Sequence, residues 1–214
     1  MVIAAEKPSR RALSKRQRQQ QLLDATIKCI SKKGLGSMTL ADVANEAGLS
    51  QGIVNLHFKS KDNLLKETLK YLFEDYDEQF MLTVANSPPQ AAAKLLALME
   101  MDVKPGVCDR QKLAVWFAFW GEAKAVPTYR KICAAYERKY DEIMLELAQN
   151  IICEGDYADI DAQTVTDVLT SMTDGLWLAC LIHPKTFDRN AAMNSIYSYL
   201  RAVFPDHYPQ ERGT

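Results

Sequence analysis

Apolar residues recur at helical spacing along almost the whole chain. From about Lys15, they follow the three- and four-residue steps of a helix until Gly34 and Gly36 interrupt the pattern. The same spacing, broken by prolines, glycines and polar clusters, predicts eight further helices. They are expected at about residues 40–47, 51–57, 62–86, 90–102, 109–124, 127–153, 161–182 and 188–203. Since β-branched residues nowhere alternate between turn signals, the expected fold class is all-α with about nine helices.

A tight turn joins the two short helices, 40–47 and 51–57. Thr39 is a suitable N-cap for the first, and Asp42 three residues later can complete a capping box. Gly48 can take the positive φ that ends a helix, and Ser50 is the expected cap of the second. Small and apolar side chains on the two helices are expected to pack together: Val43, Ala44 and Ala47 against Ile53 and Val54.

The outer face of the second short helix is small and polar. It carries Ser50, Gln51, Gly52 and Asn55. Such a helix can enter a major groove, where Gln and Asn amides suit adenine, and the glycine lets the backbone approach closely. The alternative is an ordinary helical hairpin, which does not explain why caps, polar face and flanking charge coincide.

Basic residues flank this helix at positions suited to phosphate contacts. Thr39 stands at a helix N-terminus, where backbone amides favour an anion. Further candidates follow the helix or precede the first one: His57, Lys59, Lys61, Lys7, Arg10, Arg11, Lys15, Arg16 and Arg18. Each lysine alone reads more simply as a solvated surface charge. Phosphate contacts position a protein on DNA and carry little sequence information.

The net charge of −1 hides an asymmetry. Residues 1–62 hold eleven Lys and Arg against five Asp and Glu, a net of +6, whereas residues 63–214 hold fifteen against twenty-two, a net of −7. A basic module on an acidic body indicates a polyanion-binding head. The expected organisation is a flexible basic tail over 1–14, a DNA-binding domain over 15–61 and a ligand-binding and dimerisation domain over 62–214.

The remaining composition narrows the class of protein. Five cysteines without a CxxC pair make a disulfide framework or zinc site unexpected, and they read as buried apolar residues. There is no signal-peptide core and no apolar run near the length of a membrane span, so a soluble cytoplasmic protein is expected. Scattered histidines and the absence of HExxH, P-loop and GxSxG motifs argue against catalytic, metal and cofactor sites. A helical enzyme assembled from scattered residues is the rival class.

The segment AxVAxxAGLSxGxVxxHFxSKxxLL, within residues 39–65, resembles the helix-turn-helix signature of the TetR family of repressors. The match covers about residues 16–70. It implies an all-helical homodimer that binds operator DNA and carries a C-terminal ligand-binding domain. By the same resemblance, seven residues fall at DNA-contact positions: Thr39, Ser50, Gln51, Gly52, Asn55, His57 and Lys61. The family often has tyrosine where this chain has Asn55, which favours a base contact over a phosphate contact, so relatives do not predict the operator.

Aromatic residues and one acid mark a candidate ligand site in the C-terminal part. Residues 114–120 read AVWFAFW, and Trp116 and Trp120 share a helix face. A second segment places Asp174 and Trp177 in an apolar helix, where an acid must be paired, neutralised or facing a cation. Tryptophan faces with a carboxylate suit a quaternary ammonium ion. The alternative is that these aromatics fill a core and that Asp174 bonds an arginine or a partner subunit.

These two segments resemble those of the choline-responsive repressors of glycine betaine synthesis, a TetR subfamily. The resemblance implies choline or a related quaternary ammonium effector that releases the repressor from its operator. The expected ligand contacts are Trp116, Phe119, Trp120, Asp174 and Trp177. A sensor of cationic or hydrophobic drugs that regulates an efflux pump is the alternative within the same fold.

The last two long helices are the expected dimer interface. In the family they form a four-helix bundle with their symmetry mates. The final helix has an apolar face that would be costly to expose in a monomer: Met193, Ile196, Tyr197, Leu200 and Val203. The alternative is that this face packs within its own chain.

Overall fold

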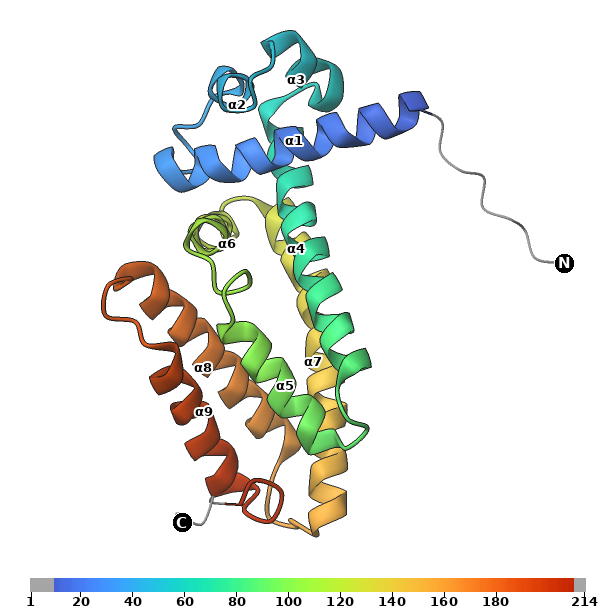
Figure 1. The fold of residues 1–214 in the computed structure, drawn as a ribbon, viewed down its shortest axis with the longest axis vertical. Helices are drawn as coiled ribbons and strands as arrows, with labels where there is room; N and C mark the ends of the chain where they lie inside the picture. The colour runs from blue at the N-terminus through green and yellow to red at the C-terminus, as the bar shows by residue number, and fades with distance from the viewer. Residues whose placement is uncertain (1–9, 210–214) are drawn as a thin grey trace, which may run out of the picture.

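The computed structural model describes residues 10–209, with side chains from residue 14 onward. Within this range the chain forms nine helices and no strand (Figure 1). They are α1 (Arg10–Lys33), α2 (Leu40–Glu46), α3 (Gln51–Phe58), α4 (Lys61–Asn86), α5 (Ala91–Val103), α6 (Arg110–Glu122), α7 (Pro127–Gly155), α8 (Ala162–Ile182) and α9 (Arg189–Val203). The all-α prediction is confirmed, and most ends lie within two residues of their expected positions.

A small head of α1, α2, α3 and the first turns of α4 sits on an elongated body (Figure 1). The predicted packing of the two short helices is confirmed, because Val43, Ala44 and Val54 are buried while Ala47 and Ile53 pack against them. The expected cap of α2 forms, whereas Ser50 stands at the N-cap position of α3 but its side chain makes no capping hydrogen bond. Thr39 and Asp42 make a complete capping box on α2, and Gly48 has a φ of +64°.

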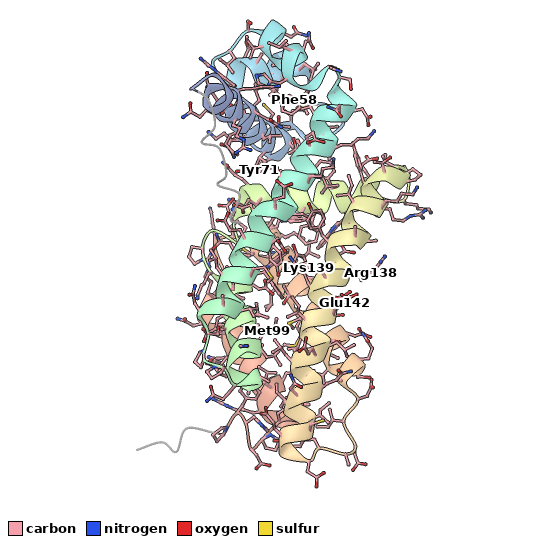
Figure 2. All side chains as sticks on the ribbon, turned by 90° about the vertical axis from the view of Figure 1, so that its right-hand side faces the viewer. Phe58, Tyr71, Met99, Arg138, Lys139 and Glu142 are labelled. Atoms are coloured by element: carbon pink, nitrogen blue, oxygen red, sulfur yellow. The ribbon has the colours of Figure 1, made fainter. Side chains whose placement is uncertain are left out.

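Helix α4 belongs to both parts of the molecule. Its first turns bury Leu64 and Leu65 in the head, and its later turns bury Phe73 and Phe80 in the body. Helix α7 packs alongside it, α5 lies against both, and α6 packs under α1 (Figures 1 and 2). The head is therefore fixed to the body by one continuous helix and by the α1–α6 contact.

The buried side chains form two apolar clusters. The upper cluster contains the head core together with Phe73, Trp116 and Trp177. The lower cluster is built from α5, α7, α8 and α9 and includes Phe80 and Met99. Figure 2 shows Phe58 of the upper cluster in the head and Met99 of the lower cluster well down the body.

Three expectations need correction at the level of local structure. Helix α1 begins at Arg10, so residues 10–14 of the expected tail are helical, and Lys7 lies outside the described residues. Four of the five free cysteines are buried as expected, but Cys153 is exposed. Helix α8 is also long and apolar enough to span a membrane, with a mean hydropathy of 1.3, the one such helix between residues 10 and 209. Its buried face packs on α5, α6, α7 and α9.

The expected dimer face of α9 is wrong in its central residues. Ile196 and Leu200 are fully buried in the lower cluster of their own chain. An amphipathic helix buries its apolar face, and here neighbouring helices of the same chain supply the partner. The large apolar side chains left exposed on this flank are on α8, where Leu178 is 41% and Ile182 is 57% exposed.

Candidate DNA-reading surface and ligand cavity

The outer face of α3 is open to solvent. Val54 and Phe58 anchor the helix in the head core, whereas Gln51, Gly52 and Asn55 are exposed. Ser50 is exposed too, and its hydroxyl makes no capping hydrogen bond, so this oxygen is free to meet a DNA group. A Cβ methyl group added to Gly52 would meet nothing closer than the Ser50 hydroxyl at 3.7 Å. Packing within the chain therefore does not require a glycine at position 52. Close approach of this helix to DNA would require one.

Basic side chains of α1 and α3 gather beside this face. Lys15 and Arg18 lie close enough to His57 to lower its pKa, in addition to the larger effect of its partial burial. His57 is thus held towards its neutral form in the DNA-free protein. A phosphate group placed between His57 and these two basic side chains would offset their repulsion and raise the pKa of His57.

Two expected phosphate contacts are engaged within the chain. The Thr39 hydroxyl accepts a hydrogen bond from the Asp42 amide at 3.1 Å, and the Asp42 carboxylate in turn pairs with Lys33 at 2.6 Å. The Lys61 ammonium donates to the carbonyl of Gly36 at 2.7 Å. An ammonium has three donors, so Lys61 can keep this bond and still meet a phosphate. Thr39 would have to share its hydroxyl with the cap.

One exposed side chain on α3 was missed at the sequence level. Leu56 is 75% exposed and lies one helical turn beyond Gly52. A single exposed apolar residue does not by itself mark an interaction site, but Leu56 lies on the helix that carries the candidate base contacts. Its signal in the sequence was weak, because a leucine beside Val54 reads as part of the core.

A cavity of about 520 Å³ lies in the body between α4, α5, α6, α7 and α8. Residues from both apolar clusters line it, so it sits where the clusters meet. Seven aromatic side chains contribute to its wall: Phe73, Tyr76, Phe80, Trp116, Trp120, Tyr140 and Trp177. Several of them meet edge to face, including Tyr76 on Trp177 with ring centroids 5.9 Å apart.

The two aromatic segments of the sequence meet at this cavity. Trp116 and Trp120, one helical turn apart on α6, both line it, as do Asp174 and Trp177 on α8. Phe119 does not. It is fully buried, with its ring edge to face against Tyr129 at 5.0 Å, because its position on α6 turns it towards the start of α7. The expected ligand contact by Phe119 is therefore corrected to a core role.

Asp102, at the end of α5, is the polar centre of the cavity and was not anticipated. Its side chain accepts hydrogen bonds from Tyr76 Oη at 2.8 Å and from Thr173 Oγ1 at 3.3 Å. Its backbone carbonyl accepts from Trp177 Nε1 at 2.8 Å. Burial raises the pKa of Asp102 to about 7, the neighbouring Asp174 adds to that rise, and the two hydrogen bonds oppose it.

Three further acids line the cavity. Burial raises the pKa of Asp174 to about 6, and it also raises the pKa of Glu137 and Asp141, which reach solvent from α7. Among the described residues, none of the four carboxyl groups has an ion-pair partner. The same part of the chain holds no cluster of acids, histidines or cysteines arranged for a metal ion. The cavity is therefore acidic, aromatic and suited to an organic cation.

A helix-turn-helix head joined by one helix to a helical body with a ligand-sized cavity defines a one-component transcriptional regulator. Family comparisons agree with this class. Residues 22–68 match the model of the bacterial regulatory proteins of the tetR family, and residues 89–205 match the C-terminal domain of BetI-type transcriptional repressors. The chain belongs to the TetR family of transcriptional repressors, with a BetI-type C-terminal domain, and is not an enzyme.

Individual relatives share most of the chain's length. The HTH-type transcriptional regulator BetI of Paraburkholderia phymatum is 30% identical over 86% of this chain and 91% of its own. BetI of Serratia proteamaculans is 26% identical over 90% of this chain and 95% of its own. The similarity thus extends through the cavity-forming helices and is not confined to the head.

Solved structures share the fold. A transcriptional regulator of Pseudomonas aeruginosa PAO1 aligns with a TM-score of 0.79 at 25% identity, covering 90% of this chain and 93% of its own. A regulator of Saccharomonospora viridis, solved in complex with choline, aligns with a TM-score of 0.74 at 20% identity, covering 87% and 96%. At that identity the second likeness concerns the fold alone.

The exposed amides of α3 lead to the first prediction. Gln51→Ala and Asn55→Ala should each weaken specific operator binding by roughly 1–3 kcal/mol, the effect of losing a good base contact, and should leave non-specific binding nearly unchanged. Fluorescence anisotropy at fixed salt, with operator and scrambled duplexes, measures both. Asn45→Ala, which changes an exposed amide on α2, is the matched control. Parent-like operator affinity in both α3 variants would remove them from the reading surface.

The buried acids lead to a prediction about the ligand-free protein. The pKa of Asp102 is about 7 in the folded state against an ordinary 3.8, so the folded state holds a proton that the unfolded state has released. The free energy of unfolding should therefore fall as pH rises from about 4 to 7, by up to ~1.4 kcal/mol per pH unit for one such group. Asp174 acts in the same direction up to about pH 6.

Urea denaturation across this pH range checks the sign. Asp102→Asn removes one titrating group, so its stability should decline less steeply with pH than that of the parent. Asp159→Asn, at an exposed acid outside the cavity, should follow the parent. Parallel curves for the parent and Asp102→Asn would show that Asp102 ionises normally.

Proposed function

We propose that this repressor binds operator DNA as a homodimer and that a small quaternary ammonium compound, with choline as first candidate, binds in the cavity and releases it. One observation carries the proposal: the cavity joins aromatic faces to carboxyl groups that have no ion-pair partner within the described chain. A cation is the missing partner.

Choline suits this cavity for electrostatic reasons. A quaternary ammonium ion cannot lose its charge on entering an apolar site, so it needs aromatic faces, carboxylates or both. Trp177 and Tyr76 supply ring surface within one hydrogen-bonded unit with Asp102, and Asp174 lines the same cavity. The choline complex of the Saccharomonospora regulator, which shares this fold, supports the assignment.

The head supplies the chemistry for operator recognition. Gln51 and Asn55 present amides to base edges, and Lys15, Arg18 and His57 present a basic flank to the phosphate backbone. Leu56 adds an apolar contact of the kind that fits a thymine methyl group. Two such heads reach successive major grooves when their reading helices are about 34–36 Å apart.

The exposed flank of the body supplies the dimer interface. Leu178 and Ile182 lie one helical turn apart on α8 and are exposed in the single chain, although they belong to a long apolar helix. A second copy related by a two-fold axis would cover both patches at once. This assignment replaces the expected contacts of Ile196 and Leu200, which are buried within the chain.

The connection between ligand and DNA runs through α4 and α6. The later turns of α4 carry Tyr76 into the cavity while its first turns hold Leu64 in the head. Helix α6 lines the cavity with Trp116 and Trp120 and packs against α1. A ligand that binds more tightly to an arrangement with unfavourable head spacing shifts the population away from DNA.

The proposed dimer interface predicts that substitutions on α8 can prevent dimerisation without unfolding the chain. The double variant Leu178→Asp with Ile182→Asp should remain helical but sediment as a monomer and lose operator binding, because each buried interface would hold four unpaired carboxylates. Leu82→Asp, at a leucine of α4 that is 50% exposed, should remain dimeric. A dimer of unchanged stability in the double variant would place the interface elsewhere.

The effector assignment is tested by calorimetry. Choline should give saturable heat at millimolar concentration or below, and 3,3-dimethylbutanol, in which carbon replaces the ammonium nitrogen, should bind at least roughly thirtyfold more weakly, equivalent to about 2 kcal/mol of cation–π attraction. Asp174→Asn should reduce choline affinity without changing operator binding in its absence. Asp159→Asn serves as the control. No saturable heat with choline or its close analogues would sink the effector assignment.

A further inference from the structure

The cavity is larger and longer than a choline ion requires. Its volume is about 520 Å³. Choline, with about seven non-hydrogen atoms, leaves much of that space unfilled by comparison with the pockets of drug-sized ligands, roughly 300–1,000 Å³. On α7 the lining runs from Arg130 to Met144, about 21 Å at 1.5 Å per residue. The space is therefore elongated along α7.

Three of the four acids of the cavity lie at two different levels, one inner and one outer. Asp102 is only 4% exposed and is held by Tyr76 and Thr173 at the inner end. Glu137 and Asp141 lie one helical turn apart on α7 and are exposed to solvent, so they form the outer pair. Asp174 lies between the two levels, close enough to interact electrostatically with both Asp102 and Glu137.

A single small cation can contact the carboxyl groups of only one of these levels. A monovalent ion beside Asp102 and Trp177 leaves the outer pair, Glu137 and Asp141, facing each other across one turn of helix. Arg130 is the basic residue that lines the described cavity, and it is exposed near the start of α7. It forms no ion pair within 4 Å with any of the four acids. The lining acids also do not form a metal-binding cluster in the described chain.

We propose that the cavity binds an elongated ligand with two cationic groups, one beside Asp102 and Trp177 and the other between Glu137 and Asp141. This inference rests on the proposed cation site and extends it from a single charge to a pair. The apolar aromatic wall between the two levels contacts the hydrocarbon that joins the two charges. The ligand class is that of linear diamines and bis-quaternary ammonium compounds.

Calorimetry with a matched series tests the second charge. The probes are bis(trimethylammonium) alkanes with spacers of about four to ten methylene groups, all shorter than the estimated 21 Å of lining, and alkyltrimethylammonium ions of equal length. The best dication should bind about tenfold more tightly than its monocation, the order expected for one extra charge interaction between the water and protein limits. Its affinity should also fall more steeply with salt.

Variants of the outer pair locate the effect. Glu137→Gln combined with Asp141→Asn should weaken dication binding by more than it weakens monocation binding, so that the roughly tenfold advantage of the dication disappears. The matched control is Glu142→Gln, since this acid is exposed next to Asp141 on α7 but does not line the cavity (Figure 2). Both substitutions of the double variant remove like charges one turn apart, so the fold should be retained.

Each remaining outcome has a defined meaning. Equal affinity for monocations and dications would overturn this inference and leave the proposed function standing. Tightest binding by a zwitterion such as glycine betaine would also overturn it, and would assign Arg130 to the ligand's carboxylate. If neither class of cation binds, both this inference and the proposed effector fail.

Discussion

The hydrogen bond from Tyr76 to Asp102 is the contact on which the arrangement of the body depends. Tyr76 belongs to α4 and packs against both apolar clusters, while Asp102 ends α5 and its carbonyl holds Trp177 of α8. Three helices therefore meet at one buried carboxyl group. Because a buried carboxyl is costly without polar partners, Tyr76 and Thr173 must stay within hydrogen-bond distance of it, which fixes polar groups at the seam between the two apolar clusters. The cavity lies at this seam.

The helices could be predicted from the sequence because the signals that define them are local. Apolar spacing, prolines and glycines mark the ends, and the capping box of Thr39 with Asp42 formed as its spacing indicates. The start of α1 was the least accurate end. Residues 10–14 read RRALS, a stretch too short and too polar to show an apolar period, so nothing in the sequence there distinguishes a helical turn from a tail.

The ligand site was predictable only where a residue contradicts its local surroundings. Asp174 interrupts an apolar helix and could be recognised, whereas Asp102 lies just before the Pro105-Gly106 turn, where a polar residue does not stand out. Only the packing of α4 and α8 around that end buries it. The sequence also does not predict which helix an apolar side chain packs against. Periodicity predicts that Ile196 and Phe119 face something apolar, and in the structure both pack within their own chain.

The two most buried acids of the cavity have pKa values close to neutral pH. With pKa values of about 7 and 6, Asp102 and Asp174 are partly protonated near neutral pH, which reduces the repulsion between them. A cation bound beside them would favour the ionised forms and release protons, so the proposed binding should strengthen as pH rises. Ionised Asp102 accepts a stronger hydrogen bond from Tyr76 than the neutral acid does. Because Tyr76 is part of α4, this hydrogen bond joins the cavity wall to the helix that continues into the DNA-reading head.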